Sequence, residues 1–211
     1  MSRKINPTGL RVGITQDWKS TWYAEGDRYA NFLIEDDKIR KYLHRALRTA
    51  GVEVILIERS IKAIKIIIRV SRPGVVIGRK GSGLSEIRSK ISKLTKHDID
   101  LQIEEVKNPE ASAPIVAEAV AMQIERRISA KRAINMAAEK AMNAGAKGIK
   151  LEISGTINGP NSIAMNDIVT KGAVPTQTLR ANIDFAKGTA FTRGGTIGIK
   201  VWVYKGEVED K

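Results

Sequence analysis

One stretch of the sequence constrains the fold most, and it reads VVIGRKGSGLSEIRSKI from Val75 to Ile91. It combines an apolar turn, a Gly-x-x-Gly motif at Gly78 and Gly81, and apolar residues at helical spacing. Glycine lacks a Cβ and lets another backbone approach closely, while the free N–H groups at a helix start attract phosphate. Arg79 and Lys80 add two positive charges between the glycines. The motif alone also fits a tight turn between two helices, so its interpretation depends on the neighbouring elements.

The flanking periodicity predicts those elements. Apolar residues recur at helical spacing from Glu35 to Ala50, and β-branched runs follow at 52–59 and 62–70. A further strand is expected from Asp98 to Val106. The order helix, strand, strand, short helix, Gly-x-x-Gly, helix, strand resembles the prokaryotic form of the KH module, whose glycine loop clamps single-stranded RNA. We therefore predict a KH RNA-binding domain over residues 17–107.

The charge balance agrees with a polyanionic partner. The 211 residues include 36 Lys and Arg against 23 Asp and Glu, a formal net charge of +13. The segment from Arg59 to Lys96 contains eleven basic residues and one acid, Glu86. It therefore carries ten of the thirteen net positive charges. Such an excess attracts nucleic acid or anionic lipid, and solubility alone does not require it. We therefore expect one basic patch on the first domain.

A second domain is predicted over residues 108–211, because Pro109 disfavours helix at the residue before it. Two Ala-rich segments, 113–128 and 130–144, have helical periodicity and predict a helical pair. Strands are expected where the later sequence alternates, at 150–154, 179–185 and 197–204. The predicted fold class is α+β: a KH domain followed by an α+β domain with a helical pair on a mainly antiparallel sheet.

Residues 1–16 are predicted to be an extended basic tail, since Pro7 and Gly9 interrupt any regular period. The candidate phosphate contacts in this tail are Arg3, Lys4 and Arg11. An aromatic group follows it, formed by Trp18, Trp22 and Tyr23. These rings either stack RNA bases or pack against their own domain, and the sequence leaves both interpretations open.

Other function classes lack a sequence signature. The chain has no cysteine, which excludes disulfides, thiolate metal sites and cysteine nucleophiles. Neither His44 nor His97 has a second ligand at metal spacing, and no phosphate-binding loop or serine elbow motif is present. We expect no catalysis, no metal and no cofactor. The apolar stretches are too short for a membrane span, so we expect no membrane partner and a cytoplasmic location.

Five ordered blocks of sequence resemble one family, the third proteins of the bacterial small ribosomal subunit. The blocks are SRKINPTGLRVGI, AEAVAMQIERRISAKRAI, AGAKGIKLEISG, VPTQTLRANIDF and GTIGIKVWVYKGE. The resemblance implies a structural protein in the head of the subunit that binds small-subunit ribosomal RNA and lines the mRNA entrance. It also implies contacts with mRNA and with the tenth and fourteenth proteins of the head. The alternative is a free-standing KH regulator or RNA chaperone that binds single-stranded RNA.

The resemblance adds site residues by position. Gly78 to Gly81 match the family's KH loop, and the basic residues between 126 and 132 match its helical region near incoming mRNA. The complete set of predicted RNA-binding residues is Arg3, Lys4, Arg11, Arg72, Gly78, Arg79, Lys80, Gly81, Arg88, Arg126, Arg127, Lys131, Arg132, Lys171 and Arg180. The chain departs from the family where further basic residues are expected, at Asn135, Met136, Thr156 and Met165.

Overall fold

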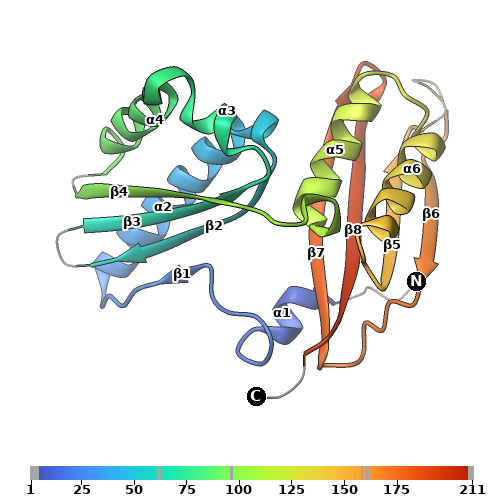
Figure 1. The fold of residues 1–211 in the computed structure, drawn as a ribbon, viewed down its shortest axis with the longest axis horizontal. Helices are drawn as coiled ribbons and strands as arrows, with labels where there is room; N and C mark the ends of the chain where they lie inside the picture. The colour runs from blue at the N-terminus through green and yellow to red at the C-terminus, as the bar shows by residue number, and fades with distance from the viewer. Residues whose placement is uncertain (1–4, 61–62, 96, 158, 160–161, 209–211) are drawn as a thin grey trace. The chain divides into compact units, whose positions relative to one another are not determined.

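The computed structural model describes residues 5–60, 63–95, 97–157, 159 and 162–208, and it divides into two compact units (Figure 1). The first unit comprises residues 18–107. The second joins residues 108–211 to the N-terminal residues up to Asp17. Both units consist of helices packed on a four-stranded sheet, which confirms the predicted α+β class.

The sheet of the first unit has the strand order β1-β2-β3-β4. β2 and β3 are antiparallel, while β1 with β2 and β3 with β4 are parallel pairs. The strands are β1 (Ser20–Thr21), β2 (Val52–Arg59), β3 (Ala63–Val70) and β4 (Asp98–Glu105). The helices are α2 (Asp27–Ala46), α3 (Pro73–Ile77) and α4 (Ser82–Ser92), with the 3-10 turns η1 (Arg48–Ala50) and η2 (Arg79–Gly81). This order confirms the predicted KH arrangement.

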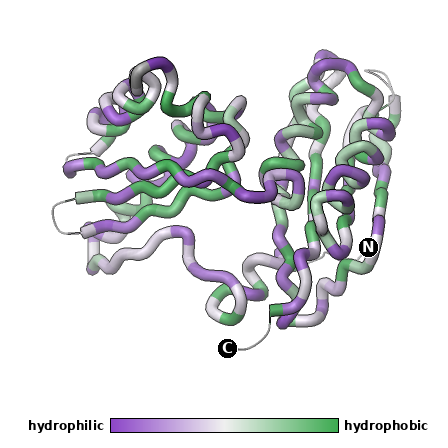
Figure 2. Tube along the Cα trace, viewed as in Figure 1, coloured by the Kyte–Doolittle hydropathy of each residue, from purple (hydrophilic) through white to green (hydrophobic). Residues whose placement is uncertain are grey.

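Alternation along the strands builds the core of this unit. Ile64, Ile66 and Ile68 of β3 are at most 1% exposed and face the helices, where Ile39 and Ile91 are fully buried. Figure 2 shows these hydrophobic stretches along the central strands. Burial of a large aliphatic side chain contributes about 1.5–3 kcal/mol, so this layer holds α2 and α4 on the sheet.

Helix α2 begins at Asp27, eight residues before the predicted start at Glu35. Leu33 and Ile34 in the extra turns are exposed, and the buried face of the helix continues through the acid Asp36, which an apolar pattern does not count. Gly26 marks the start instead, with a φ of 57° that an L side chain rarely adopts. The helix also ends earlier than predicted, because its last turn tightens into η1.

The second unit has an antiparallel sheet with the order β6-β5-β8-β7. Its elements are η3 (Pro109–Ala111), α5 (Ala113–Glu125), α6 (Ala130–Asn143), β5 (Gly148–Gly155), β6 (Met165–Gly172), β7 (Ala181–Thr192) and β8 (Gly195–Glu207). Ile149, Leu151, Val201 and Val203 are fully buried in one core with the alanines of both helices. This confirms the predicted helical pair on an antiparallel sheet.

Strand β6 is the one element of this sheet that the sequence analysis misses. It lies at the sheet edge, and none of its residues is fully buried. Its sequence, MNDIVTKG, therefore lacks the apolar alternation that reveals a strand with a buried face. Its pairing with β5 in regular register, from Gly148 with Gly172 to Gly155 with Met165, defines it instead.

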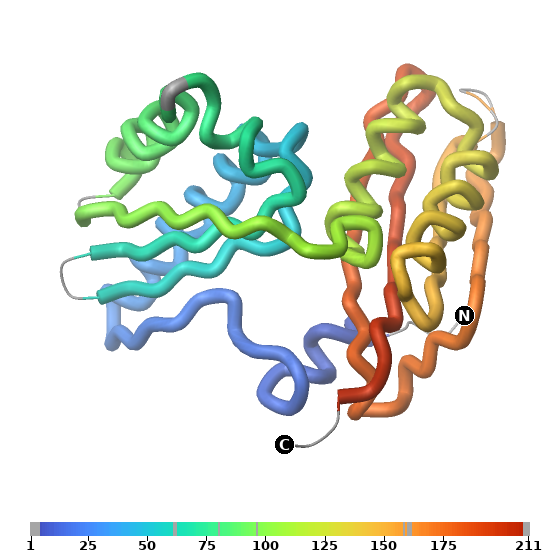
Figure 3. The backbone as a smooth tube through the Cα atoms, in the orientation of Figure 1, coloured from blue at the N-terminus to red at the C-terminus, as the bar shows by residue number. Residues whose placement is uncertain are grey.

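The prediction of an extended tail is wrong for the N-terminal segment. Pro7–Arg11 form a short helix, α1, with the Asn6 side chain capping its first turn. Figure 3 shows this segment beside the start of β7, which is an edge strand. The side chains of Arg11 and Gln16 donate hydrogen bonds to the carbonyls of Ala181 and Ile183, at 2.8 and 3.0 Å. The segment is therefore part of the second unit.

Candidate nucleic-acid interface

The Gly-x-x-Gly loop connects α3 to α4 through the single turn η2. Gly78 ends α3 with a φ of 67°, and Gly81 precedes α4 with a φ of 79°. These left-handed values favour glycine at both positions. Gly81 also has open space around it, since a Cβ there would meet nothing within 4 Å. A ligand backbone therefore has access to the start of α4.

Close packing between α3 and α4 fixes the shape of this loop. A Cβ built on Gly83 would lie 2.5 Å from the Val76 carbonyl oxygen and 3.3 Å from that of Ile77. Only a residue without a side chain allows the first turn of α4 to approach the end of α3 so closely. Gly83 follows the motif in the sequence but was not singled out, because no spacing rule marks a close approach between two helices.

The basic residues of the loop and α4 differ in whether a nearby acid neutralises their charge. Lys90 pairs with Glu86 one turn away at 2.6 Å, and this hydrogen bond raises the pKa of Lys90 and lowers that of Glu86. Arg79 and Arg88 are exposed and pair with no acid among the described residues. Val75, 55% exposed, and Ile77, 40% exposed, lie next to the loop. Free guanidinium groups beside apolar surface suit phosphates and unstacked bases.

The prediction of one continuous patch from Arg59 to Lys96 is wrong in part. Arg59 is buried and forms ion pairs with Asp36 at 2.6 Å and Glu35 at 2.9 Å. Arg69 pairs with Glu104 on the neighbouring strand, and Lys65 pairs with Glu58. These side chains are close in sequence to the loop, but the fold places them on other surfaces or inside the unit. The patch that remains is the loop and α4.

A second basic surface surrounds the connection between α5 and α6. Arg126 and Arg127 lie in the turn after α5, while Lys131 and Arg132 lie in the first turn of α6, and all four are exposed. Arg127 has a φ of 65° and is the one non-glycine residue with positive φ in the described part of the chain. That conformation is uncommon for a side chain of this size. Of the four cations, Arg127 and Lys131 line a common pocket.

The first turn of α6 has the wrong charges for a helix start. Asp and Glu are favourable there, and each cation costs about 0.3–1 kcal/mol against the helix dipole. The turn instead contains Lys131 and Arg132 and no acid, and Ser129 makes no capping hydrogen bond with its side chain. An anion bound at this end would offset that cost.

The fold brings further side chains to this surface. A pocket of about 690 Å³ is lined by Arg127 and Lys131, by Arg193 of the β7–β8 turn, and by Phe191, which is 68% exposed. Arg193 and Phe191 are not among the residues predicted from the sequence, because only the pairing of β7 with β8 places them beside the start of α6. Thr156 also lines the pocket, and its hydroxyl donates to the Gly194 carbonyl at 3.1 Å.

Arg11 is a correction to the predicted RNA contacts. Its guanidinium is fully buried and donates to the carbonyls of Pro7, Thr176, Thr178 and Ala181, at 2.8–3.1 Å. Burial also lowers its pKa from the usual arginine value. No donor of this group faces outward to a phosphate, so Arg11 holds the second unit together instead.

The remaining predicted residues are dispersed. Arg72 is exposed and donates to the Thr49 carbonyl at 2.6 Å, while Lys171 is paired with Glu139 at 3.0 Å. Arg180 is exposed in the turn before β7. Arg3 and Lys4 lie outside the described residues.

The described part of the chain contains neither a candidate metal site nor a candidate membrane span. Within the described residues no three His, Asp or Glu side chains gather as a metal site requires. None of the described helices is long and apolar enough to cross a membrane.

Comparison with known families accounts for both units. The KH domain family matches residues 38–111, and the family described as ribosomal protein S3, C-terminal domain, matches residues 120–203. The small ribosomal subunit protein uS3 of Shewanella loihica is 46% identical over 210 residues, covering 100% of this chain and 91% of the relative. That of Pelagibacter ubique is also 46% identical, over 208 residues, covering 99% and 92%. The chain belongs to the uS3 family.

Membership of the uS3 family confirms the resemblance seen in the sequence. The protein is a structural constituent of the small ribosomal subunit, an RNA-binding ribosomal protein and not an enzyme. The predicted location, the ribosome in the cytoplasm, follows from the same family.

Proposed function

We propose that this uS3 protein binds small-subunit ribosomal RNA in the head and lines the mRNA entrance, where it contacts mRNA and the tenth and fourteenth proteins of the head. The two basic surfaces carry these roles. The loop surface consists of Gly78, Arg79, Gly81 and Arg88, and Lys80 is assigned to it from its sequence position, because its side chain lies outside the described part of the structure. The turn surface consists of Arg126, Arg127, Lys131 and Arg132. Arg72 and Arg180 add exposed positive charge outside these two surfaces.

The single observation that carries the proposal is the first turn of α6. Lys131 and Arg132 stand where the helix dipole disfavours them, beside an arginine with positive φ. Folding alone gains nothing from this arrangement, whereas an anionic strand passing the turn would be bound by the cations and by the free N–H groups together. Lys171 is already paired with Glu139, so we assign Lys171 a smaller role in RNA binding.

The turn surface can be tested in small subunits that contain the protein, with mRNA carrying photoreactive uridines downstream of the decoding site. Lys131→Glu should reduce cross-links between mRNA and the protein without destabilising it, because a glutamate suits the start of α6. Lys140→Glu, on the last turn of the same helix, is the matched control and should keep the cross-links. Equal cross-linking in both variants would contradict a role for the turn at the mRNA entrance.

The loop surface can be tested with the full chain and single-stranded RNA. Arg79→Asp with Lys80→Asp should lower affinity and reduce the salt dependence, by a log–log slope of about 0.7 for each lost phosphate contact. The control is Lys38→Asp with Arg45→Asp, which makes the same charge change on exposed positions of α2. A double loop variant that is folded and binds RNA with unchanged slope would refute the assignment.

A further inference from the structure

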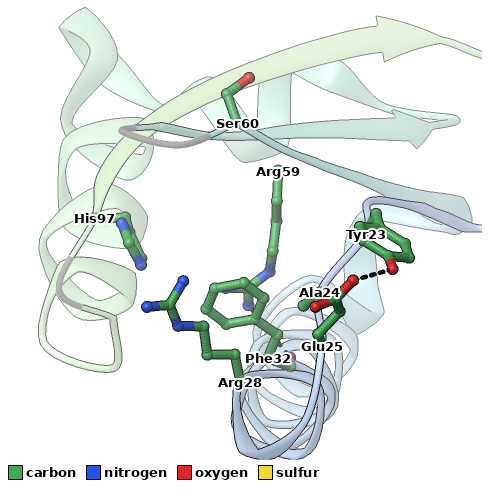
Figure 4. Close-up of a pocket in the computed structure, with 8 residues that line it drawn as sticks. All are labelled: Tyr23, Ala24, Glu25, Arg28, Phe32, Arg59, Ser60 and His97. Carbon is green, nitrogen blue, oxygen red and sulfur yellow. Dashed lines mark hydrogen bonds between the residues drawn. The ribbon is translucent and has the colours of Figure 1, made fainter.

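A pocket in the first unit is separate from the glycine loop. It has a volume of about 790 Å³ and is lined by Tyr23, Ala24, Glu25, Arg28, Phe32, Arg59, Ser60 and His97. That volume is within the range of small-molecule sites. The glycine loop precedes α4 and His97 follows it, so a helix of 11 residues, about 16 Å at 1.5 Å per residue, lies between the two. Figure 4 shows the side chains around the pocket.

One side of this pocket offers unneutralised donors. Arg28 and Phe32 lie one turn apart on α2, and the His97 ring contacts the Phe32 ring edge-on, with centroids 6.0 Å apart. In Figure 4 the Arg28 guanidinium and the His97 imidazole lie on the same side of Phe32. Arg59 also lines the pocket, but its charge is matched by Glu35 and Asp36. Arg28 pairs with no acid among the described residues, so it is the cation available to an anion.

The other side of the pocket offers an aromatic platform. Tyr23 is 83% exposed, and its hydroxyl donates to the Glu25 carboxylate at 2.6 Å. This hydrogen bond raises the pKa of Tyr23 and fixes the direction of its hydroxyl. Trp22, in contrast, packs against Tyr29 and Phe32 and donates to Asp36 at 2.9 Å. The aromatic residues therefore have different roles: Trp22 packs in the fold, while Tyr23 is oriented by Glu25 and remains exposed.

The position of Arg28 supports a ligand role. It is the second residue of α2, where a cation is unfavourable against the helix dipole and an acid would be stabilising. An exposed ring and an unpaired cation on opposite sides of one pocket match the two parts of a nucleotide, a flat base and a phosphate. We propose that this pocket binds an unpaired RNA nucleotide, with its base stacked on Tyr23 and its phosphate held by Arg28 and His97.

This inference rests on the proposed function in one respect, that the partner of the chain is RNA. The pocket then gives the first unit a second contact at the far end of α4 from the glycine loop. An RNA strand that follows α4 would be held at both ends of the helix.

The test uses the full chain and the imidazole NMR signals of its two histidines, His44 and His97. Adenosine 5′-monophosphate should shift the His97 signal and leave that of His44, which lies on α2 outside the pocket lining. Adenosine alone and inorganic phosphate alone should each bind about tenfold more weakly, since each lacks one of the two contacts. If inorganic phosphate shifts the His97 signal with the same affinity as adenosine monophosphate, the pocket is an anion site without base stacking, and the proposal is overturned.

Variants identify the two contacts. Arg28→Glu should weaken the response to adenosine monophosphate at least about tenfold while α2 stays folded, because glutamate suits a helix start. Lys38→Glu makes the same charge change on α2 outside the pocket and should leave the response intact. Tyr23→Ala should remove the preference for the nucleotide over inorganic phosphate. A His97 signal that never moves, or that moves equally in Arg28→Glu, would overturn the proposal.

The double variant Arg79→Asp with Lys80→Asp separates this proposal from the function proposed for the loop. It should lose affinity for single-stranded RNA but keep the His97 response to the mononucleotide. Loss of that response in the double variant would mean that His97 reports on the loop, and the pocket would no longer count as a separate site.

Discussion

Replacement of Arg11 should destabilise the second unit rather than weaken RNA binding. The perturbation is Arg11→Met, which keeps much of the side-chain volume and removes the guanidinium. Four carbonyl oxygens then lose the guanidinium donor, those of Pro7 and Ala181 in buried surroundings and those of Thr176 and Thr178 in partly buried ones, and the Thr178 oxygen keeps the backbone N–H of Ala181 at 3.2 Å. The N-terminal segment thereby loses its side-chain hydrogen bonds to Ala181 and to the turn before β7, while Gln16 still donates to the Ile183 carbonyl.

The magnitude follows from the burial of each bond. An unsatisfied buried carbonyl costs about 1–3 kcal/mol, and water can replace the donor at the two partly buried oxygens. Removing the buried positive charge recovers part of this cost, because arginine is desolvated in the native state. We expect a loss of about 2–4 kcal/mol in the free energy of unfolding of the second unit. Arg11→Lys should lose most of the same amount, since an ammonium group cannot reach four carbonyls around a planar fork.

The assay is chemical denaturation of the full chain with hydrogen exchange read separately for the two units. Faster exchange should be confined to residues 5–17 and the start of β7, and binding of single-stranded RNA by the folded protein should be unchanged. The reasoning is refuted if Arg11→Met unfolds like the wild type and binds RNA less tightly, because Arg11 would then contact phosphate as the sequence alone predicts.

Three further outcomes follow from the structure. Gly83→Ala should destabilise the first unit by about 1–3 kcal/mol in thermal unfolding, because its Cβ meets the Val76 carbonyl, whereas Gly74→Ala has open space and should be neutral or stabilising. Asp36→Ala should cost about 3–5 kcal/mol by denaturation, since it leaves Arg59 buried with one partner fewer, and an unchanged midpoint would contradict this. Asn135→Lys, on an exposed position of α6, should steepen the salt dependence of RNA binding by about 0.7, and an unchanged slope would place Asn135 away from phosphate.

Sequence periodicity predicted the elements whose residues alternate between core and solvent. The bounds of β2 are those predicted from its β-branched run, and β3 ends at Val70 as predicted, while its predicted start at residue 62 lies outside the described residues. Elements without a buried face were missed or misplaced: β6 at a sheet edge, and the first two turns of α2 with Leu33 and Ile34 exposed. Apolar periodicity arises because one face of a helix or strand is buried. It therefore does not predict a helix or strand whose faces both remain in contact with solvent.

The candidate site shows a different limit. The glycine loop could be found because its residues are contiguous, and so could the four cations between 126 and 132. Counting charges along the chain gave the wrong role for Arg59 and Arg11. An arginine can bind RNA or can be buried in the fold, and the outcome depends on carbonyls and carboxylates that are distant in sequence. Ala181, for example, lies 170 residues from Arg11.

The N-terminal segment changes which fragments of this protein can be studied separately. A fragment that ends at Val106 and begins at Met1 would carry α1 without β7, so Arg11 would lose its carbonyl partners in the 176–181 region. The complementary fragment from Asn108 would expose the edge of β7, where unpaired backbone groups favour association with other chains. Residues 18–107 contain the KH sheet and its helices entirely. We therefore expect that fragment to fold alone, whereas a fragment 108–211 should require the N-terminal segment, supplied in the same chain or as a peptide, to remain monomeric in sedimentation. A stable monomer of 108–211 without that segment would show that Arg11 and Gln16 are dispensable for protecting the edge.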